Sequence, residues 1–166
     1  KLCVINLQHF KENTSVELRK AFIQCAAAET FLLWHKYKTD NNGGEELQNQ
    51  LESGIIPEDF KRQMFYTFGD YRDLCLDKNI GSDVSEVEKN IKRVFSSNGD
   101  KTPNGQSRLD WWGKNCQDIW QGMLCGLSHA SGNISNVETI KNNNTYSLVK
   151  FSGDNRGPTL EEFSKR

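Results

Sequence analysis

Cysteines and histidines are the residues of this 166-residue chain with the clearest capacity for chemistry. The sequence contains five cysteines, which are Cys3, Cys25, Cys75, Cys116 and Cys125. It contains three histidines, which are His9, His35 and His129. No two cysteines have the C-x-x-C spacing typical of a zinc or redox site, so we expect no metal and no cofactor. The thiols are either reduced and buried or paired in the disulfides of an extracellular protein, and an odd count then leaves one cysteine unpaired.

The motifs of common enzyme classes are missing from the sequence. It has no phosphate-binding glycine loop, no nucleophile-elbow motif and no H-E-x-x-H motif. His35 has no evident nucleophile or orienting partner, and the adjacent acids Glu45 and Glu46 point apart rather than toward one substrate. We therefore predict that the protein is not an enzyme and has no catalytic residues.

Charge and hydropathy exclude two further classes of protein. Lys and Arg total 21 against 22 Asp and Glu, a net charge of -1, which argues against a generally basic nucleic-acid-binding protein. The mean hydropathy is -0.71, and no apolar run approaches the roughly 18 residues of a membrane span. Lys89, Lys92 and Arg93 form a small basic cluster, but the interspersed acids favour a solvated face over a site for anionic glycans.

Four long segments with helix-start signals predict the elements that position these residues. Thr14 and Glu17 form a capping box, as do Asp83 and Glu86, and Pro57 followed by two acids is typical of a first helical turn. The main helices are expected at 14–37, 57–76, 83–95 and 107–129, with a short extra helix at 45–52.

The rest of the chain is predicted to form loops and a tail. Glycine- and asparagine-rich breaks occur at 41–44, 98–105 and 131–144, and we interpret their asparagines as solvated. One extended segment is expected at 146–151. The predicted fold is all-α and a single unit over residues 1–166. It is a bundle of four main helices with a short extra helix and an irregular C-terminal tail at 133–166.

Core positions follow from the helical spacing. Leu32 and Leu109 belong to the apolar stripes of the first and last main helices. The adjacent Trp111 and Trp112 point about 100° apart, so we expect Trp112 in the core and Trp111 partly buried. Gly69, inside the second main helix, is interpreted as a site of close helix packing.

An up-down-up-down order of the four helices predicts which cysteines meet. In that order the first helix is antiparallel to the fourth, and the second is parallel to the fourth. Cys25 and Cys116 are then level near the middles of their helices, and Cys75 and Cys125 lie at one end of the bundle. We therefore predict two disulfides, Cys25–Cys116 and Cys75–Cys125, with Cys3 unpaired in this chain. The alternative is that these cysteines are buried thiols that pack as small apolar side chains.

Several long strings of the sequence resemble a known family. They are residues 26–37 (AAAETFLLWHKY), 56–73 (IPEDFKRQMFYTFGDYRD), the pair Trp111-Trp112 and residues 119–125 (IWQGMLC). Their order and spacing are similar to those in the central helical subdomain of Duffy-binding-like domains, as found in the erythrocyte membrane protein 1 family of the malaria parasite Plasmodium falciparum. The resemblance covers nearly the whole chain.

The resemblance implies a division into three subdomains, of which this chain is similar to the middle one. The first and last subdomains, and with them the partner of Cys3, are then expected outside the chain. The sequence departs from the family pattern at Cys25 and Cys116, where the resemblance implies small residues other than cysteine. An additional disulfide between the two explains both departures.

Adhesion is the function that the resemblance implies. Such proteins lie on the surface of infected erythrocytes as the extracellular part of a membrane protein and bind host receptors. The expected partners are an endothelial adhesion molecule, an immunoglobulin or a glycosaminoglycan, together with host antibodies and the rest of the parent multidomain protein. We expect receptor contacts on exposed helix faces or on the three loops named above, not in a deep pocket. The alternative is a structural core and antibody target that has no receptor site of its own.

Overall fold

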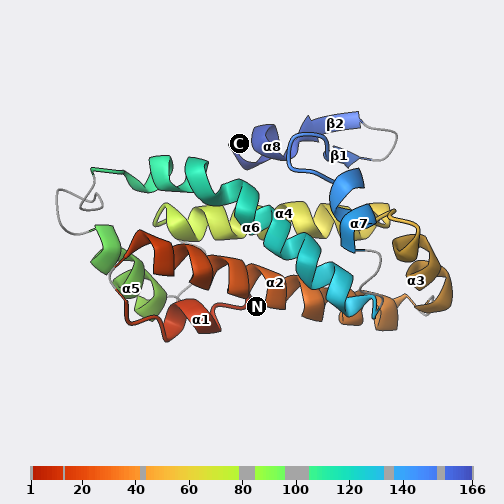
Figure 1. Ribbon diagram of the computed structural model, residues 1–166, viewed down its shortest axis with the longest axis horizontal. Coiled ribbons are helices and arrows are strands. Elements are labelled where there is room, and N and C mark those ends of the chain that lie inside the picture. Colours follow the sequence, from red (N-terminus) through yellow and green to blue (C-terminus); the bar gives the residue numbers. More distant parts are fainter. Residues whose placement is uncertain are drawn as a thin grey trace.

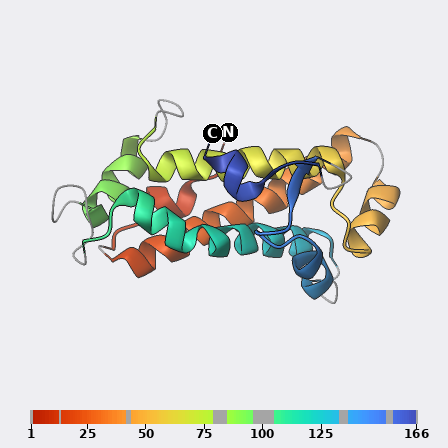
Figure 2. The same ribbon diagram turned by 90° about the horizontal axis from the view of Figure 1, so that it is seen from above.

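Three long helices form the body of the protein. The structure, a computed structural model, describes residues 2–12, 14–41, 44–78, 85–95, 105–132, 137–152 and 156–165. The long helices α2 (Ser15–Asp40), α4 (Glu58–Cys75) and α6 (Arg108–Ala130) lie side by side along the long axis (Figures 1 and 2). The shorter helices are α1 (Ile5–Gln8), α3 (Gly44–Glu52), α5 (Ser85–Phe95), α7 (Val137–Asn143) and α8 (Leu160–Ser164). Strands β1 (Lys150–Ser152) and β2 (Arg156–Thr159) pair antiparallel. The predicted all-α class is confirmed.

The long helices begin where the sequence signals predict. The Thr14 hydroxyl accepts a hydrogen bond of 3.2 Å from the backbone N–H of Glu17, which caps α2. The Ser107 hydroxyl accepts one of 3.1 Å from the N–H of Asp110 and caps α6 in the same way. Helix α4 follows Pro57 directly and has two acids in its first turn.

Contacts between aromatic rings define the directions of the long helices. Phe22 meets Tyr71 with ring centroids 6.3 Å apart, whereas Trp34 meets Phe60 at 5.1 Å near the other end of α4, so α2 and α4 are antiparallel. The end of α4 lies at the start of α6, because the Arg108 guanidinium donates to the carbonyl oxygen of Cys75 at 3.2 Å. Helices α2 and α6 are therefore parallel.

The predicted up-down-up-down order is wrong. The third of the four predicted main helices, α5, has only 11 residues and packs beside α1 at one end of the body (Figure 1), so it does not cross the length of the bundle. The chain therefore returns from α4 into α6 at the same end. This reverses α6 relative to the assumed order and makes it parallel to α2 and antiparallel to α4.

Both tryptophans of the adjacent pair are buried, because α6 is covered on two sides. Trp111 is 1% exposed and contacts Phe95 of α5, while Trp112 is 3% exposed and contacts Phe68 of α4. Phe22 of α2 lies against both rings. The expectation of a partly buried Trp111 is wrong. In the described part of the chain, no helix has the length and apolarity that a membrane crossing requires.

The C-terminal tail has more regular structure than its composition predicts. Helix α8 and the β1–β2 hairpin cover α4, where the rings of Phe151 and Phe163 stack at 5.0 Å and both lie against Phe65, while α7 packs against α6. Asn144, expected to be solvated, is buried. Its amide donates to the carbonyl oxygens of Gly54 and Ile140, at 3.2 and 2.9 Å. The extended segment begins later than predicted, since β1 starts at Lys150 and residues 146–148 form a turn.

Helices α2 and α6 approach each other at two glycines. A Cβ atom at Gly126 would lie 2.2 Å from the carbonyl oxygen of Ala27, and one at Gly122 would lie 2.8 Å from Cγ2 of Ile23. Both distances are far below van der Waals contact, so the close parallel packing requires glycine at these positions. Close packing was expected at Gly69 instead, where the nearest atom to an added Cβ would lie at an ordinary 3.9 Å.

We predict that Gly126→Ala lowers the free energy of unfolding by about 2–3 kcal/mol, because the added methyl group collides with backbone rather than with a movable side chain. Gly113→Ala is the matched control, since Gly113 is in the same helix and an added Cβ would meet nothing within 4 Å. That variant should gain up to about 1 kcal/mol from helix propensity. Chemical denaturation of both variants checks the pair, and equal stabilities would contradict the close contact.

Candidate functional site

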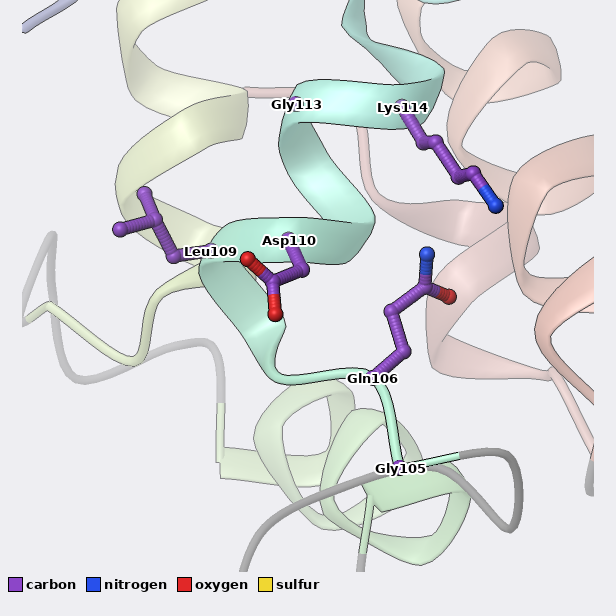
Figure 3. Close-up of a pocket in the computed structure, with 6 residues that line it drawn as sticks. All are labelled: Gly105, Gln106, Leu109, Asp110, Gly113 and Lys114. Atoms are coloured by element: carbon purple, nitrogen blue, oxygen red, sulfur yellow. The ribbon is translucent and has the colours of Figure 1, made fainter.

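The first half of α6 borders two hollows on the surface. The larger has a volume of about 610 Å³ and is lined by Gly105 together with the residues that we call the α6 face. The α6 face consists of Gln106, Leu109, Asp110, Gly113 and Lys114. In Figure 3, Gln106 and Lys114 reach toward each other on one side of the helix, while Leu109 points to the other side, toward α4. The hollow is broad and open.

The second hollow lies beside the first, between α6, α4 and the C-terminal helix α8. Its volume is about 310 Å³, and it shares Leu109 and Gly113 with the first hollow. Arg72 and Tyr146 both line it, and the thiol of Cys116 lies 3.6 Å from the Tyr146 hydroxyl. Burial is the main cause that raises the pKa of Tyr146, and the contact with Cys116 adds to it. Both groups are therefore neutral at physiological pH.

Leu109 separates the two hollows and is exposed. Its exposed fraction is 57%, although the helical spacing predicts a core position in line with Trp112 and Cys116. The prediction is wrong for Leu109 because this residue lies in the first turn of α6, where it borders the hollows instead of a packed helix. An apolar side chain is thus presented on a ridge between two concave surfaces.

An ion pair between the buried Arg108 and the partly buried Glu88 holds the start of α6 in place. The Arg108 guanidinium donates to a Glu88 carboxylate oxygen at 2.6 Å and to the carbonyl oxygen of Cys75 at 3.2 Å. It also lies 5.4 Å from the ring centroid of Phe95, close enough for a cation–π contact. Because these groups come from α4 and α5, Arg108 joins three helices directly beneath the α6 face. These contacts fix the position of the α6 face relative to α4 and α5.

The charges around the two hollows are mixed in sign. Asp110 and Lys114 lie on the α6 face, and Arg72, Glu161 and Lys165 line the second hollow. The Lys165 ammonium forms an ion pair of 3.0 Å with Glu161, which neutralises part of the basic charge. This distribution fits the polar surround of a protein–protein contact better than a site for a polyanion.

Of the basic cluster noted in the sequence, Lys89 and Lys92 are exposed, whereas Arg93 makes contacts within the protein, as do Lys61 and Arg62. Arg93 donates to the carbonyl oxygen of Phe10 at 2.8 Å and lies over the ring of the same residue. Lys61 donates to the carbonyl oxygen of Ser152 at 3.4 Å, and burial lowers its pKa. Arg62 pairs with acids of its own helix. Arg93, Lys61 and Arg62 are therefore engaged in contacts within the protein.

The structure brings together neither of the two predicted cysteine pairs, and all five thiols are free. The Cys75 thiol lies 3.8 Å from the carbonyl oxygen of Arg108 at the start of α6, whereas Cys125 is in the last turns of the same helix. Cys116 faces the second hollow, and Cys25 faces α1. The physical reason is the direction of α6. Because α6 runs parallel to α2, Cys25 lies about two helical turns beyond the level of Cys116.

The histidines and the loops singled out in the sequence are the remaining candidate positions. Within the described ranges, no three His, Cys, Asp or Glu side chains are grouped as metal ligands. His35, interpreted as structural, packs edge-on against Phe31 with centroids 4.7 Å apart. Of the expected contact loops, residues 42–43, 98–104 and 133–136 lie outside the described residues. Gly105 lines the larger hollow, and Asn41 lines a third one of about 450 Å³ between α2 and α4.

We predict that the thiols of the reduced protein react with iodoacetamide in two groups. Cys3 and Cys125 are partly exposed and should react first. Burial raises the pKa of Cys116 and Cys75, and it raises that of Cys25 to about 11, so these three should react slowly. The rate at Cys25 should keep rising with pH beyond the usual thiol pKa of about 8.5. Pulsed alkylation followed by mass spectrometry measures this order, and equal labelling of all five thiols would contradict it.

Comparison with known proteins gives one result. A family model, the Duffy binding domain, matches residues 1–160. This range contains the three long helices and the larger hollow. It also contains the second hollow apart from the lining residues Glu161, Ser164 and Lys165. No curated protein and no solved structure matches the chain.

Proposed function

Because the chain belongs to the Duffy binding domain family, whose members are extracellular adhesion modules that bind host cell-surface receptors, we propose that it binds such a receptor through the α6 face. The chain is then a binding module, and no catalytic step is involved. A contact of ordinary size covers roughly 800 Å² on each partner, so it would extend over Leu109 and both hollows.

The observation that carries this proposal is the exposed Leu109 on its ridge. Covering a leucine side chain contributes about 1.5–3 kcal/mol, and the hollows on either side would accept side chains of the partner. The start of α6 is held by Arg108, so little ordering is required when the partner binds. A rigid helix with an apolar ridge and a polar rim is suited to binding another protein.

A protein receptor fits the charges better than a glycosaminoglycan. A polyanion requires several unpaired cations on one surface, but the α6 face and the second hollow carry acids beside their basic residues. The basic residues Arg93, Lys61 and Arg62 are hydrogen-bonded or ion-paired within the protein. An endothelial adhesion molecule or an immunoglobulin is therefore the class of partner that we favour.

We further propose that the parent protein is an adhesin of the erythrocyte membrane protein 1 type. This proposal rests on the strings at 26–37, 56–73 and 119–125 and on the family membership. The chain would then be an extracellular part of a membrane protein on the infected erythrocyte, would mediate cytoadherence and would be a target of host antibodies. Its neighbours would be the other subdomains of the parent protein.

We predict that Leu109→Asp weakens receptor binding about 10- to 100-fold, which corresponds to about 1.4–2.8 kcal/mol, because it replaces an apolar contact with a charge that must lose water. Leu32→Asp is the matched control. Leu32 is 58% exposed against 57% for Leu109, and it lies on α2 rather than on the α6 face. Since both side chains are exposed, both variants should fold normally. Surface plasmon resonance against a panel of endothelial receptors and immunoglobulins measures the difference.

The outcomes of this experiment separate the alternatives. Equal binding by the two variants, or a loss confined to Leu32→Asp, would refute the placement on the α6 face. If the 166-residue chain binds nothing that a complete three-subdomain domain binds, the chain is a structural core without its own receptor site. Binding to heparin or chondroitin sulfate that disappears with added salt would replace the protein partner by a glycan.

A further inference from the structure

The segment before α1 and the middle of α2 converge on one hydroxyl group. The Tyr71 hydroxyl lies 2.7 Å from the carbonyl oxygen of Cys3 and 3.0 Å from that of Cys25, and the whole Tyr71 side chain is buried. Two carbonyl groups that share one donor must lie close together. Cys3 and Cys25 are therefore neighbours in space, although α1 and the start of α2 separate them in the chain.

The backbone of Cys3 is held at both of its polar groups. Its N–H donates to a carboxylate oxygen of Glu29 at 2.8 Å, and its carbonyl oxygen accepts from Tyr71. Glu29 is one turn after Cys25 on α2 and is only 9% exposed. The carboxylate and the hydroxyl together fix Cys3 against the turn of α2 that carries Cys25.

The Cys25 side chain points toward the segment that contains Cys3. Its sulfur lies 4.0 Å from the side-chain oxygen of Asn6, and the backbone N–H groups of Asn6 and Leu7 also point toward it. Asn6 and Leu7 are in the first turn of α1, which begins two residues after Cys3. Charge on Cys3 also acts on the Cys25 thiol, although burial has the larger effect on its pKa. The two thiol groups thus share one small region.

We propose that Cys3 and Cys25 form a disulfide bond when the protein is exposed to a low-molecular-weight disulfide such as oxidised glutathione. This differs from the sequence-based expectation that Cys3 has no partner in the chain. Members of the family are extracellular, where disulfides form and persist. The bond would tie α1 and the segment before it to α2 at the position where Tyr71 already joins them.

The chemistry begins at Cys3, which is the more exposed of the two thiols. The Cys3 thiolate attacks one sulfur of oxidised glutathione, forms a mixed disulfide and releases one reduced glutathione. The Cys25 thiolate then attacks the Cys3 sulfur and releases a second glutathione. Two protein thiols are oxidised and one glutathione disulfide is reduced, so atoms and electrons balance.

The other cysteines lack this juxtaposition. Cys75 is beside the carbonyl oxygen of Arg108, Cys116 contacts the Tyr146 hydroxyl, and Cys125 is in the last turns of α6. Cys3 and Cys25 are the two cysteines whose backbones accept from the same side chain.

The test uses the full 166-residue chain, equilibrated with a mixture of reduced and oxidised glutathione. Free thiols are blocked, and peptides are mapped by mass spectrometry without reduction. The expected result is a peptide that contains Cys3 linked to Cys25. Recovery of Cys3 as a free or glutathione-capped thiol with Cys25 unlinked, or of Cys3 in any other linkage, overturns the proposal.

A second measurement compares the oxidised and reduced forms of the same protein. The midpoint of thermal unfolding of the oxidised protein should exceed that of the reduced protein by several degrees, because the bond constrains the unfolded chain. Cys3→Ser should abolish this difference, whereas the matched control Cys125→Ser should retain it, since both residues are partly exposed. A redox-dependent difference that persists in Cys3→Ser, or its absence in the unmodified protein, also overturns the proposal.

Discussion

The parallel contact between α2 and α6 determines the rest of the structure. It depends on two backbones that approach each other where Gly122 and Gly126 have no side chain. Once α6 lies there, Phe22 of α2 can contact both Trp111 and Trp112, and the other sides of these rings are left for α4 and α5. The remaining helices then fill the faces that this pair leaves uncovered. Any larger residue at Gly126 would force the backbones apart and open the aromatic core from its centre.

The position of the candidate site follows from the same contact. Because α6 runs parallel to α2, its first turn meets the last turn of α4, and Arg108 is buried there between Glu88 and the carbonyl oxygen of Cys75. The residues that follow Arg108 on the outer side of the helix therefore lie on a fixed support. Leu109 is exposed for this reason, since the helix is anchored by its neighbour and not by the leucine itself. The exposed position of Leu109 thus results from the packing of α6, and we propose that receptor binding uses this residue.

The sequence predicts the helices well and their arrangement poorly, for a physical reason. Hydroxyl caps and Pro57 act within one turn, so the starts of α2, α4 and α6 are local properties that a single sequence reveals. Helix direction depends instead on whether α5 crosses the bundle, and its apolar spacing is the same in either case. The predicted Cys25–Cys116 and Cys75–Cys125 disulfides depended on that direction, and the structure does not bring either pair together. Asn144 was wrongly predicted to be solvated, because its hydrogen bonds to Gly54 and Ile140 form only in the folded chain. Polar residues at 106, 110 and 114 mark the exposed side of the start of α6, but the second hollow beside it requires neighbours that are distant in sequence.

One turn of α4 connects the parts of the molecule to which we assign roles. Tyr71 holds the segments of Cys3 and Cys25, Arg72 lines the second hollow, and the carbonyl oxygen of Cys75 anchors the start of α6. These groups lie within five consecutive residues, so the α6 face, the second hollow and the junction of α1 with α2 share one rigid support. A force applied to Leu109 by a bound receptor would pass through Arg108 into this turn and from there into α2. For a module that holds cells together, joining the binding surface to the core through buried hydrogen bonds resists such a force better than surface ion pairs, because water does not compete for the buried donors and acceptors.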